Sequence, residues 1–305
     1  MLNCAPILER RTNRLLTFGP LVRFLSQSIE ADMTVNFYDI TANNTSITGA
    51  PDDDKFRIHL GGLSGLSLFG NPGGVNTINF LAAGTLTFDA ISAITNFKFS
   101  AFGPLGQFIY LTAANLQELP GGSTPTFHVT GPTANHAAEL VIEPSGQAQN
   151  LNFRHVAVSN FARADDAFVF DFGSDTTNDR VVGALHARNL IEFGSGNDTG
   201  IGGTANDVFS AGQGNDYFNG SGGINVVDLD GDLNQFGIVK IAPNEYRVHD
   251  HSAGSSHGHD TLVNIQYIRF NDATIYIGGN VPVVTVGSSA ALAHGIGAHH
   301  VDLIA

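Results

Sequence analysis

The sequence predicts an all-β protein whose C-terminal half, residues 161–285, forms a parallel β-roll. Three observations predict this fold class: a composition rich in turn-forming residues, short β-prone runs separated by turn signals, and a nine-residue period over residues 193–228. With 305 residues, the chain is long enough to bury a hydrophobic core.

The composition favours strands and tight turns over helices. Glycine occurs 36 times and phenylalanine 22 times, while charged residues make up only 14% of the chain. A formal net charge of −14 argues against nucleic acid and anionic membrane surfaces as partners. Cys4 is the single cysteine, so no intramolecular disulfide forms. No apolar run reaches about 18 residues, so we expect no membrane span.

Residues 1–33 are interpreted as a leader or disordered segment. They carry Arg10, Arg11, Arg14 and Arg23 but lack the compact apolar stretch of a secretory signal peptide. A short basic amphipathic segment over residues 14–25 is the alternative. On the first interpretation, the functional chain begins near Met33.

Residues 34–160 alternate β-prone runs with Gly, Pro and Asn clusters, which predicts closely spaced short strands. Residues 112–119 are compatible with one or two helical turns. The region is either a degenerate continuation of the same coil or a separate β-domain. Examples of the expected strands are residues 35–38, 56–59, 76–80, 85–88, 96–99, 108–111 and 126–130.

Residues 193–228 divide without a gap into four nine-residue blocks, FGSGNDTGI, GGTANDVFS, AGQGNDYFN and GSGGINVVD. Each block reads as a six-residue turn followed by a three-residue strand. Glycine at positions one, two and four lets backbone carbonyls turn inward. Position eight points into the core, so two blocks complete one coil of two facing strands.

The sixth position of each block predicts a calcium site. Two blocks per coil place Asp198 and Asp216 on one edge, and Asp207 and Asn225 on the other. Carboxylates and carbonyls from neighbouring coils then form an all-oxygen cavity, which suits Ca²⁺ better than Mg²⁺ or Zn²⁺. The expected ligands are Asp198, Asp207, Asp216 and Asn225, with the carbonyls of Gly194, Gly196, Gly203, Ala205, Gly212 and Gly214.

Calcium is also expected to control folding. Stacked carboxylates repel each other without metal, and each turn buries a single large apolar side chain. Burial at about 25 cal/mol per Å² then does not offset ordering of about 1–2 kcal/mol per residue. We therefore expect the roll to be disordered without calcium and folded with it.

The blocks resemble the Gly-Gly-x-Gly-x-Asp-x-(large apolar)-x repeats of the RTX, or hemolysin-type, calcium-binding family. The resemblance covers about residues 161–305 and includes candidate capping strands at residues 229–240 and 260–272. Departures at Phe193, Gly200, Ala205, Ala211 and Ser221 reduce the expectation to two or three calcium sites.

The resemblance also implies a route out of the cell. Many members of the family leave Gram-negative bacteria by type I secretion with an uncleaved C-terminal signal. The chain ends Val301-Asp-Leu-Ile-Ala305 after an acid-free stretch over residues 288–300, which is similar to such signals. Residues 286–305 are therefore a candidate secretion signal, and the expected location is extracellular.

Catalytic motifs give no clear sign of an enzyme. The sequence contains no H-E-x-x-H and no Walker loop. His249, His251, His257 and His259 are either a zinc or nickel site or a polar loop. A structural, adhesive or surface-assembly role is favoured, with polysaccharide or a second copy as partner. The alternative is a small polysaccharide-acting enzyme that uses carboxylates among Asp39, Asp52–Asp54, Asp89, Glu118, Glu139 and Glu143.

Overall fold

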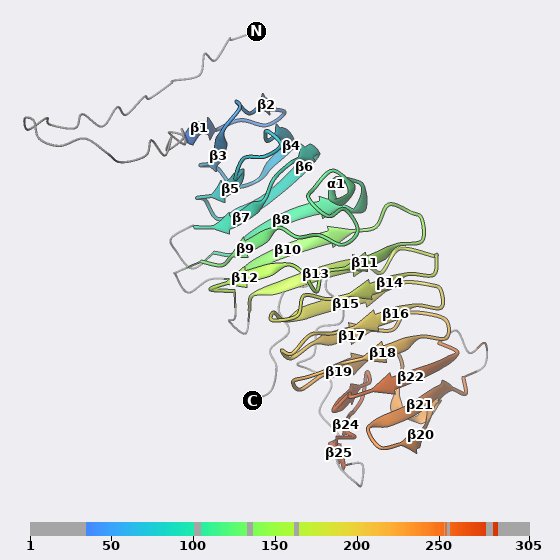
Figure 1. Ribbon diagram of the computed structural model, residues 1–305. Helices are drawn as coiled ribbons and strands as arrows, with labels where there is room; N and C mark the ends of the chain where they lie inside the picture. The colour runs from blue at the N-terminus through green and yellow to red at the C-terminus, as the bar shows by residue number, and fades with distance from the viewer. Residues whose placement is uncertain are drawn as a thin grey trace, which may run out of the picture.

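Parallel strands stacked along one axis make up most of the structure, a computed structural model (Figure 1). Strands take up 49% of the residues and helices 3%, which confirms the all-β prediction. The structure describes residues 35–100, 105–132, 137–161, 165–252, 254, 257–278 and 283–285. The predicted leader (residues 1–33) and C-terminal tail (residues 286–305) lie outside these ranges.

The strands form three sheets, each with a fixed strand order. The six-stranded sheet contains β1 (Val35–Ile40), β3 (Asp53–Ile58), β5 (Thr77–Phe80), β7 (Asn96–Phe99), β9 (His128–Thr130) and β12 (Ala157–Ser159). The twelve-stranded sheet contains β2 (Ser46–Thr48), β4 (Leu63–Phe69), β6 (Gly84–Ser92), β8 (Gln107–Thr112), β10 (Ala138–Glu143), β13 (Ala167–Phe172), β15 (Asn189–Phe193), β17 (Val208–Ser210), β19 (Val226–Asp228), β23 (Tyr267–Arg269), β24 (Thr274–Tyr276) and β25 (Val283–Thr285). The seven-stranded sheet contains β11 (Asn150–Asn152), β14 (Arg180–Val182), β16 (Thr199–Ile201), β18 (Tyr217–Asn219), β22 (His259–Val263), β21 (Glu245–Asp250) and β20 (Phe236–Ala242), in that order.

From β1 to β19, successive strands lie in different sheets, and each pairs in parallel with a strand of a neighbouring coil. The twelve-stranded sheet crosses residue 160 without a break, because Glu139 of β10 pairs with Ala167 of β13. The six-stranded sheet ends near that point at β12, and the seven-stranded sheet begins at β11. The chain is therefore wound continuously from the N-terminal region into the repeat region.

The nine-residue blocks have the local structure that their pattern predicts. Strands β16 to β19 each occupy positions seven to nine of a block. Thr199 pairs with Tyr217, and Phe209 pairs with Val227, so equivalent strands lie one coil apart. Position eight is inward: Phe209, Phe218 and Val227 are all 0% exposed.

Aromatic contacts between coils account for the abundance of phenylalanine. The ring of Phe153 lies edge-to-face against Phe170 at a centroid distance of 4.9 Å and against Phe127 at 6.1 Å. Farther along the stack, Phe218 lies 6.1 Å from Phe193 and 5.3 Å from Phe209. Buried aromatic side chains are large for a three-residue strand, so one ring per strand fills the narrow interior.

The two ends of the stack differ. At the C-terminal end, β20, β21 and β22 pair antiparallel, as do β23, β24 and β25, and these strands end two of the sheets. These strands include parts of both segments that were expected to cap the roll, residues 229–240 and 260–272. At the N-terminal end, β1 and β2 each have a partner strand on one side only among the described residues.

The N-terminal region contains strands beyond the examples named from the sequence. These are β2, β4, β10, β11 and β12, and Leu66 and Leu68 of β4 are fully buried. The expected helical turn is present as α1 (Ala113–Gln117). The Thr112 hydroxyl accepts a hydrogen bond from the Asn115 amide at 3.1 Å, and Asn115 Oδ1 accepts one from the Thr112 amide at 3.0 Å, which forms a capping box.

Candidate metal centre

Aspartates of successive coils form a ladder at the turns that lead into the seven-stranded sheet. Asp198 Oδ1 accepts a hydrogen bond from the Asp179 amide at 2.7 Å, and Asp216 Oδ1 accepts one from the Asp198 amide at 2.8 Å. Asp260 Oδ1 continues the pattern with the Asp216 amide at 2.9 Å. These four residues form the acidic ladder, and all four are buried.

A second ladder runs along the opposite edge, at the turns that lead into the twelve-stranded sheet. There the residues alternate between carboxylate and amide: Asn189, Asp207, Asn225 and Gln266. The Asp207 amide donates to Asn225 Oδ1 at 2.9 Å, and the Asn225 amide donates to Gln266 Oε1 at 2.7 Å. These residues form the mixed ladder, which carries fewer charges per coil than the acidic ladder.

The two ladders differ in how their carboxylate oxygens are satisfied. Asp207 Oδ1 accepts from both the amide and the side chain of Asn189 at 2.8 Å, and Asp207 Oδ2 accepts from the Gly203 amide at 2.8 Å. In contrast, the Oδ2 atoms of Asp198 and Asp216 are buried and have no hydrogen-bond donor in the described part of the chain. Asp175 Oδ2, one turn earlier, is likewise buried and has no hydrogen-bond donor among the described residues. A buried anionic oxygen without a donor is costly unless a cation balances it.

Burial raises the pKa of aspartates on both ladders, and that of Asp207 on the mixed ladder rises to about 7. Burial, together with the neighbouring charges of Asp260 and Asp198, raises the pKa of Asp216 to about 8. Burial likewise raises the pKa of Asp260 to about 7, and that of Asp198 to about 6. Without a counter-ion, the folded acidic ladder therefore favours the protonated carboxyl, as expected for stacked acids.

Backbone carbonyls approach the next coil closely at the glycine positions. A Cβ atom on Gly214 would lie 1.5 Å from the carbonyl oxygen of Gly196, and one on Gly258 would lie 2.3 Å from that of Gly214. Gly214 has φ = 126°, a conformation that L side chains rarely adopt. On the edge of the mixed ladder, a Cβ atom added to Gly223 would lie 2.2 Å from the carbonyl oxygen of Ala205.

Three of the predicted carbonyl ligands already have protein partners. The Gly194 carbonyl accepts from the Gln213 amide at 2.7 Å, and the Gly203 carbonyl accepts from the Gly222 amide at 2.9 Å. The Gly212 carbonyl lies 2.6 Å from His257 Nδ1. The carbonyls of Gly196 and Gly214 remain the better candidates, because they face the α-carbon of a glycine in the next coil.

No group of three or more His, Cys, Asp or Glu side chains in the described ranges is arranged to hold a metal ion. A cation at the acidic ladder would therefore need backbone carbonyls among its ligands. Ca²⁺ accepts carbonyl and carboxylate oxygens in a flexible geometry, whereas Zn²⁺ prefers nitrogen and sulfur. The unpaired Oδ2 atoms and the glycine-lined turns fit a calcium ion.

Two members of the acidic turns were missed in the sequence. Asp179 follows Asn178 and precedes a strand, as Asp198 follows Asn197, but the two aspartates are 19 residues apart instead of 18. Asp175 has no equivalent in the blocks. Asp260 begins the segment 260–272 that was expected to cap the roll, and 44 residues separate it from Asp216.

The four histidines expected on one loop do not form one site, and two of them lie on strands: His249 on β21 and His259 on β22. The rings of His249 and His251 lie 4.0 Å apart, and that of His259 lies 5.8 Å from His249. His257 instead turns toward the roll, where it contacts the Gly212 carbonyl. The interpretation as a polar surface loop fits this division better than a four-histidine metal site.

Comparisons with known proteins identified no relative of this chain. No family model, no curated protein and no solved structure matches this chain. Among the described residues, no helix combines the length and the apolar character needed to span a membrane.

Proposed function

We propose that this chain is a secreted calcium-binding protein whose repeat region folds on binding Ca²⁺ outside the cell. Its role on this proposal is structural, adhesive or surface-assembling. The observation that carries the proposal is the acidic ladder, in which buried Oδ2 atoms of Asp198 and Asp216 lack any donor in the described structure. Asp207 provides the contrast, because both of its oxygens are satisfied by protein donors.

The residues that would hold calcium are Asp198 and Asp216, together with the carbonyls of Gly196 and Gly214. Asp179 and Asp260 would extend the same row of sites by one coil in each direction. When bound, calcium supplies positive charge that offsets the repulsion between stacked carboxylates. The protein's part is to bring acids of consecutive coils to one edge and to exclude water from them.

Calcium dependence also agrees with export through a type I system. Extracellular calcium sites bind with a Kd of about 10⁻⁴–10⁻³ M, so such sites stay empty in a cytosol and fill outside. A chain that folds only at the higher concentration can be threaded unfolded. The sequence signal in residues 286–305 is the part of the chain that would direct this export.

The enzyme alternative has less support. In the N-terminal region, burial raises the pKa of Glu139 to about 7, and the opposing charge of Arg188 lowers it only partly. A raised carboxyl pKa is common at catalytic acids. However, Glu139 is 4% exposed, so a polysaccharide would not reach its carboxyl group in this conformation.

Calcium titration followed by far-ultraviolet circular dichroism tests the proposal directly. Full-length protein in a calcium-free buffer should lack much of its β-signal and gain it on addition of millimolar calcium, while magnesium should not substitute. Light scattering on the same samples separates folding from aggregation. A complete β-spectrum in the chelator, unchanged by calcium, would refute metal-coupled folding.

A further inference from the structure

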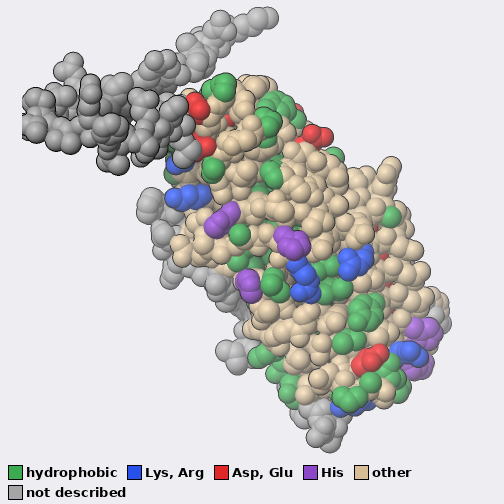
Figure 2. Space-filling model, viewed as in Figure 1, with side chains coloured by type: hydrophobic (Ala, Val, Ile, Leu, Met, Phe, Trp, Pro, Cys, Tyr) green, Lys and Arg blue, Asp and Glu red, His purple; other side chains and the backbone are tan. Residues whose placement is uncertain are grey.

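Charged side chains are segregated between the outer faces of the sheets. In the six-stranded sheet, alternate residues point outward, and these include Lys55, Arg57 and Lys98 with His59 and His128 close by. We call these five residues the basic face. In Figure 2, basic and histidine side chains lie over the middle of the visible surface and again at its lower right, and acidic ones lie mainly toward its ends.

The outer face of the twelve-stranded sheet has the opposite character. The acids on its strands outnumber the cations, which are Arg188, just before β15, and Arg269. These acids are Asp89, Glu139, Glu143, Asp171, Glu192 and Asp228. Three cations of this chain of net charge −14 therefore lie together on the six-stranded sheet, and other cations lie on the seven-stranded sheet at Arg180, Lys240 and Arg247.

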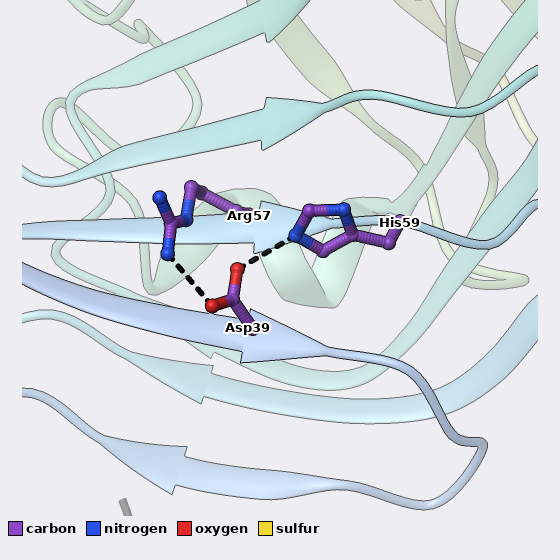
Figure 3. Close-up of polar contacts among 3 residues, drawn as sticks. All are labelled: Asp39, Arg57 and His59. Carbon is purple, nitrogen blue, oxygen red and sulfur yellow. Dashed lines mark hydrogen bonds and ion pairs between the residues drawn. The ribbon is translucent and has the colours of Figure 1, made fainter. Parts of the chain in front are cut away.

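The acids on the six-stranded sheet are engaged by their own neighbours. Asp39 accepts a hydrogen bond from Arg57 at 2.7 Å, and His59 Nε2 lies 2.6 Å from its other oxygen (Figure 3). Burial acts to raise the pKa of Asp39, but the contacts with Arg57 and His59 lower it overall. Asp53 accepts from the Val75 amide at 2.6 Å. Neither acid forms an ion pair with Lys55 or Lys98 within the described residues.

An exposed aromatic ring lies among these cations. Phe37 is 43% exposed, the Arg57 guanidinium carbon lies 4.8 Å from its ring centroid, and Lys55 Nζ lies 5.6 Å from it. Cations held against a ring are ordered without being buried. The end of the face at β1 and β3 therefore offers a partly exposed aromatic ring beside positive charge.

Hydrogen-bonding side chains continue the face across the sheet in two straight rows. Lys55, Thr77, Asn96 and His128 pair in sequence along one row, and Arg57, Asn79, Lys98 and Thr130 pair along the next. Neighbouring strands are about 4.8 Å apart, so the four strands of each row span about 14 Å. The result is two rows of polar side chains at regular intervals.

We propose that the basic face binds an anionic polysaccharide laid across the strands, with Lys55 and Lys98 as charge contacts and Phe37 as an apolar contact. The inference rests on the proposed secreted role and names the class of partner. Duplex DNA carries a charge about every 1.7 Å, and a face with three Lys and Arg residues on so acidic a protein is too sparse for it. A chain with one carboxylate every one or two sugars matches that sparse spacing.

Binding to hyaluronan tests the proposal, because its glucuronate groups alternate with neutral sugars. Folded, calcium-loaded full-length protein should bind it in a surface plasmon resonance or affinity electrophoresis assay, with affinity that falls as salt rises. The K98E variant should bind about tenfold or more weakly, since reversing a contact charge costs at least about 1.4 kcal/mol. Arg247→Glu is the matched control, because Arg247 is exposed on β21 of another sheet, and it should bind as wild type does.

Other outcomes would overturn the inference. Equal binding to neutral dextran would mean that charge is not recognised, and tighter binding to duplex DNA would point to a polyphosphate site. Loss of binding in Arg247→Glu as large as in Lys98→Glu would show only a nonspecific charge effect. No binding by protein that still folds with calcium would refute this proposal and leave the calcium proposal intact.

Discussion

Asp216 and Asp198 are joined across one coil, since Asp216 Oδ1 accepts a hydrogen bond from the Asp198 amide at 2.8 Å. The second oxygen of each carboxylate is buried and has no hydrogen-bond donor in the described part of the chain. The first oxygen thus holds neighbouring coils in register, and the second is available to a cation. Separate variants can test these two roles.

Asp216→Asn should remove calcium binding while keeping the coil contact, because an asparagine Oδ1 can still accept from the Asp198 amide. A site filled at about 100 times its Kd stabilises the fold by about 2.7 kcal/mol, so about that much calcium-dependent stability should disappear. Urea unfolding with and without calcium measures the difference. Without calcium, the variant should be at least as stable as wild type, because a buried charge has been removed.

Asp207→Asn is the matched control on the mixed ladder. Its side-chain amide would oppose the donors from Gly203 and Asn189, and an unsatisfied buried donor costs about 1–3 kcal/mol. That cost should be the same with and without calcium. If Asp207→Asn abolished the calcium increment and Asp216→Asn kept it, the assignment of calcium to the acidic ladder would be wrong.

The calcium-free protein should become less stable as the pH rises. The ordinary pKa of an aspartate is 3.8, whereas in the fold the pKa values of Asp198, Asp260 and Asp216 are raised to about 6, 7 and 8. Between these limits the folded state holds more protons than the unfolded state, so stability falls from about pH 4 to pH 8. Calcium should reverse the trend, because it competes with protons for the same carboxylates. Thermal unfolding at pH 5 and pH 8, with and without calcium, measures the direction of this change in stability. If the Asp216→Asn variant showed the same pH dependence as wild type without calcium, the explanation from the raised pKa of Asp216 would be wrong.

The repeat region was predictable because its coils have equal length. Asp198 and Asp216 are 18 residues apart, and so are their paired strands, so sequence position and position in space coincide. Asp179 was not identified from the sequence, because its coil has one residue more than the others. Asp260 was hard to align with the nine-residue blocks, because β20 and β21 are inserted before it. One extra residue in a turn shifts the frame of the sequence but leaves the ladder in space unchanged.

The N-terminal region was only partly predictable because its coils differ in length. Lys55 pairs with Thr77, Thr77 with Asn96, and Asn96 with His128, so no constant period connects them. The strand β4 was missed because Gly65 and two serines interrupt its leucines, although those leucines face the core. The proposed assignment of calcium to one ladder also could not be made from the sequence, because it depends on donors such as the Gly203 amide that no spacing reveals.

Gly214→Ala should destabilise the roll by about 3 kcal/mol or more. The added methyl group would lie 1.5 Å from the Gly196 carbonyl oxygen, and the residue would keep an unfavourable φ of 126°. Gly146→Ala is the control, since Gly146 also has a positive φ, of 73°, but nothing lies within 4 Å of the new atom. Conformation alone should cost it about 1–2 kcal/mol. Equal losses for the two variants in chemical unfolding would mean that close stacking of the turns does not matter.

Phe218→Ala should couple core packing to calcium affinity. Phe218 is 0% exposed and contacts the rings of Phe193 and Phe209, so its truncation should cost about 3–5 kcal/mol. Because folding and metal binding are proposed to be one equilibrium, that loss must appear as a higher calcium concentration at the folding midpoint. Tyr217→Ala removes the adjacent outward side chain, which is 37% exposed, and should shift the midpoint little. A Phe218→Ala protein that unfolds more easily in urea, yet folds at the same calcium concentration as wild type, would show that calcium binds without driving the fold.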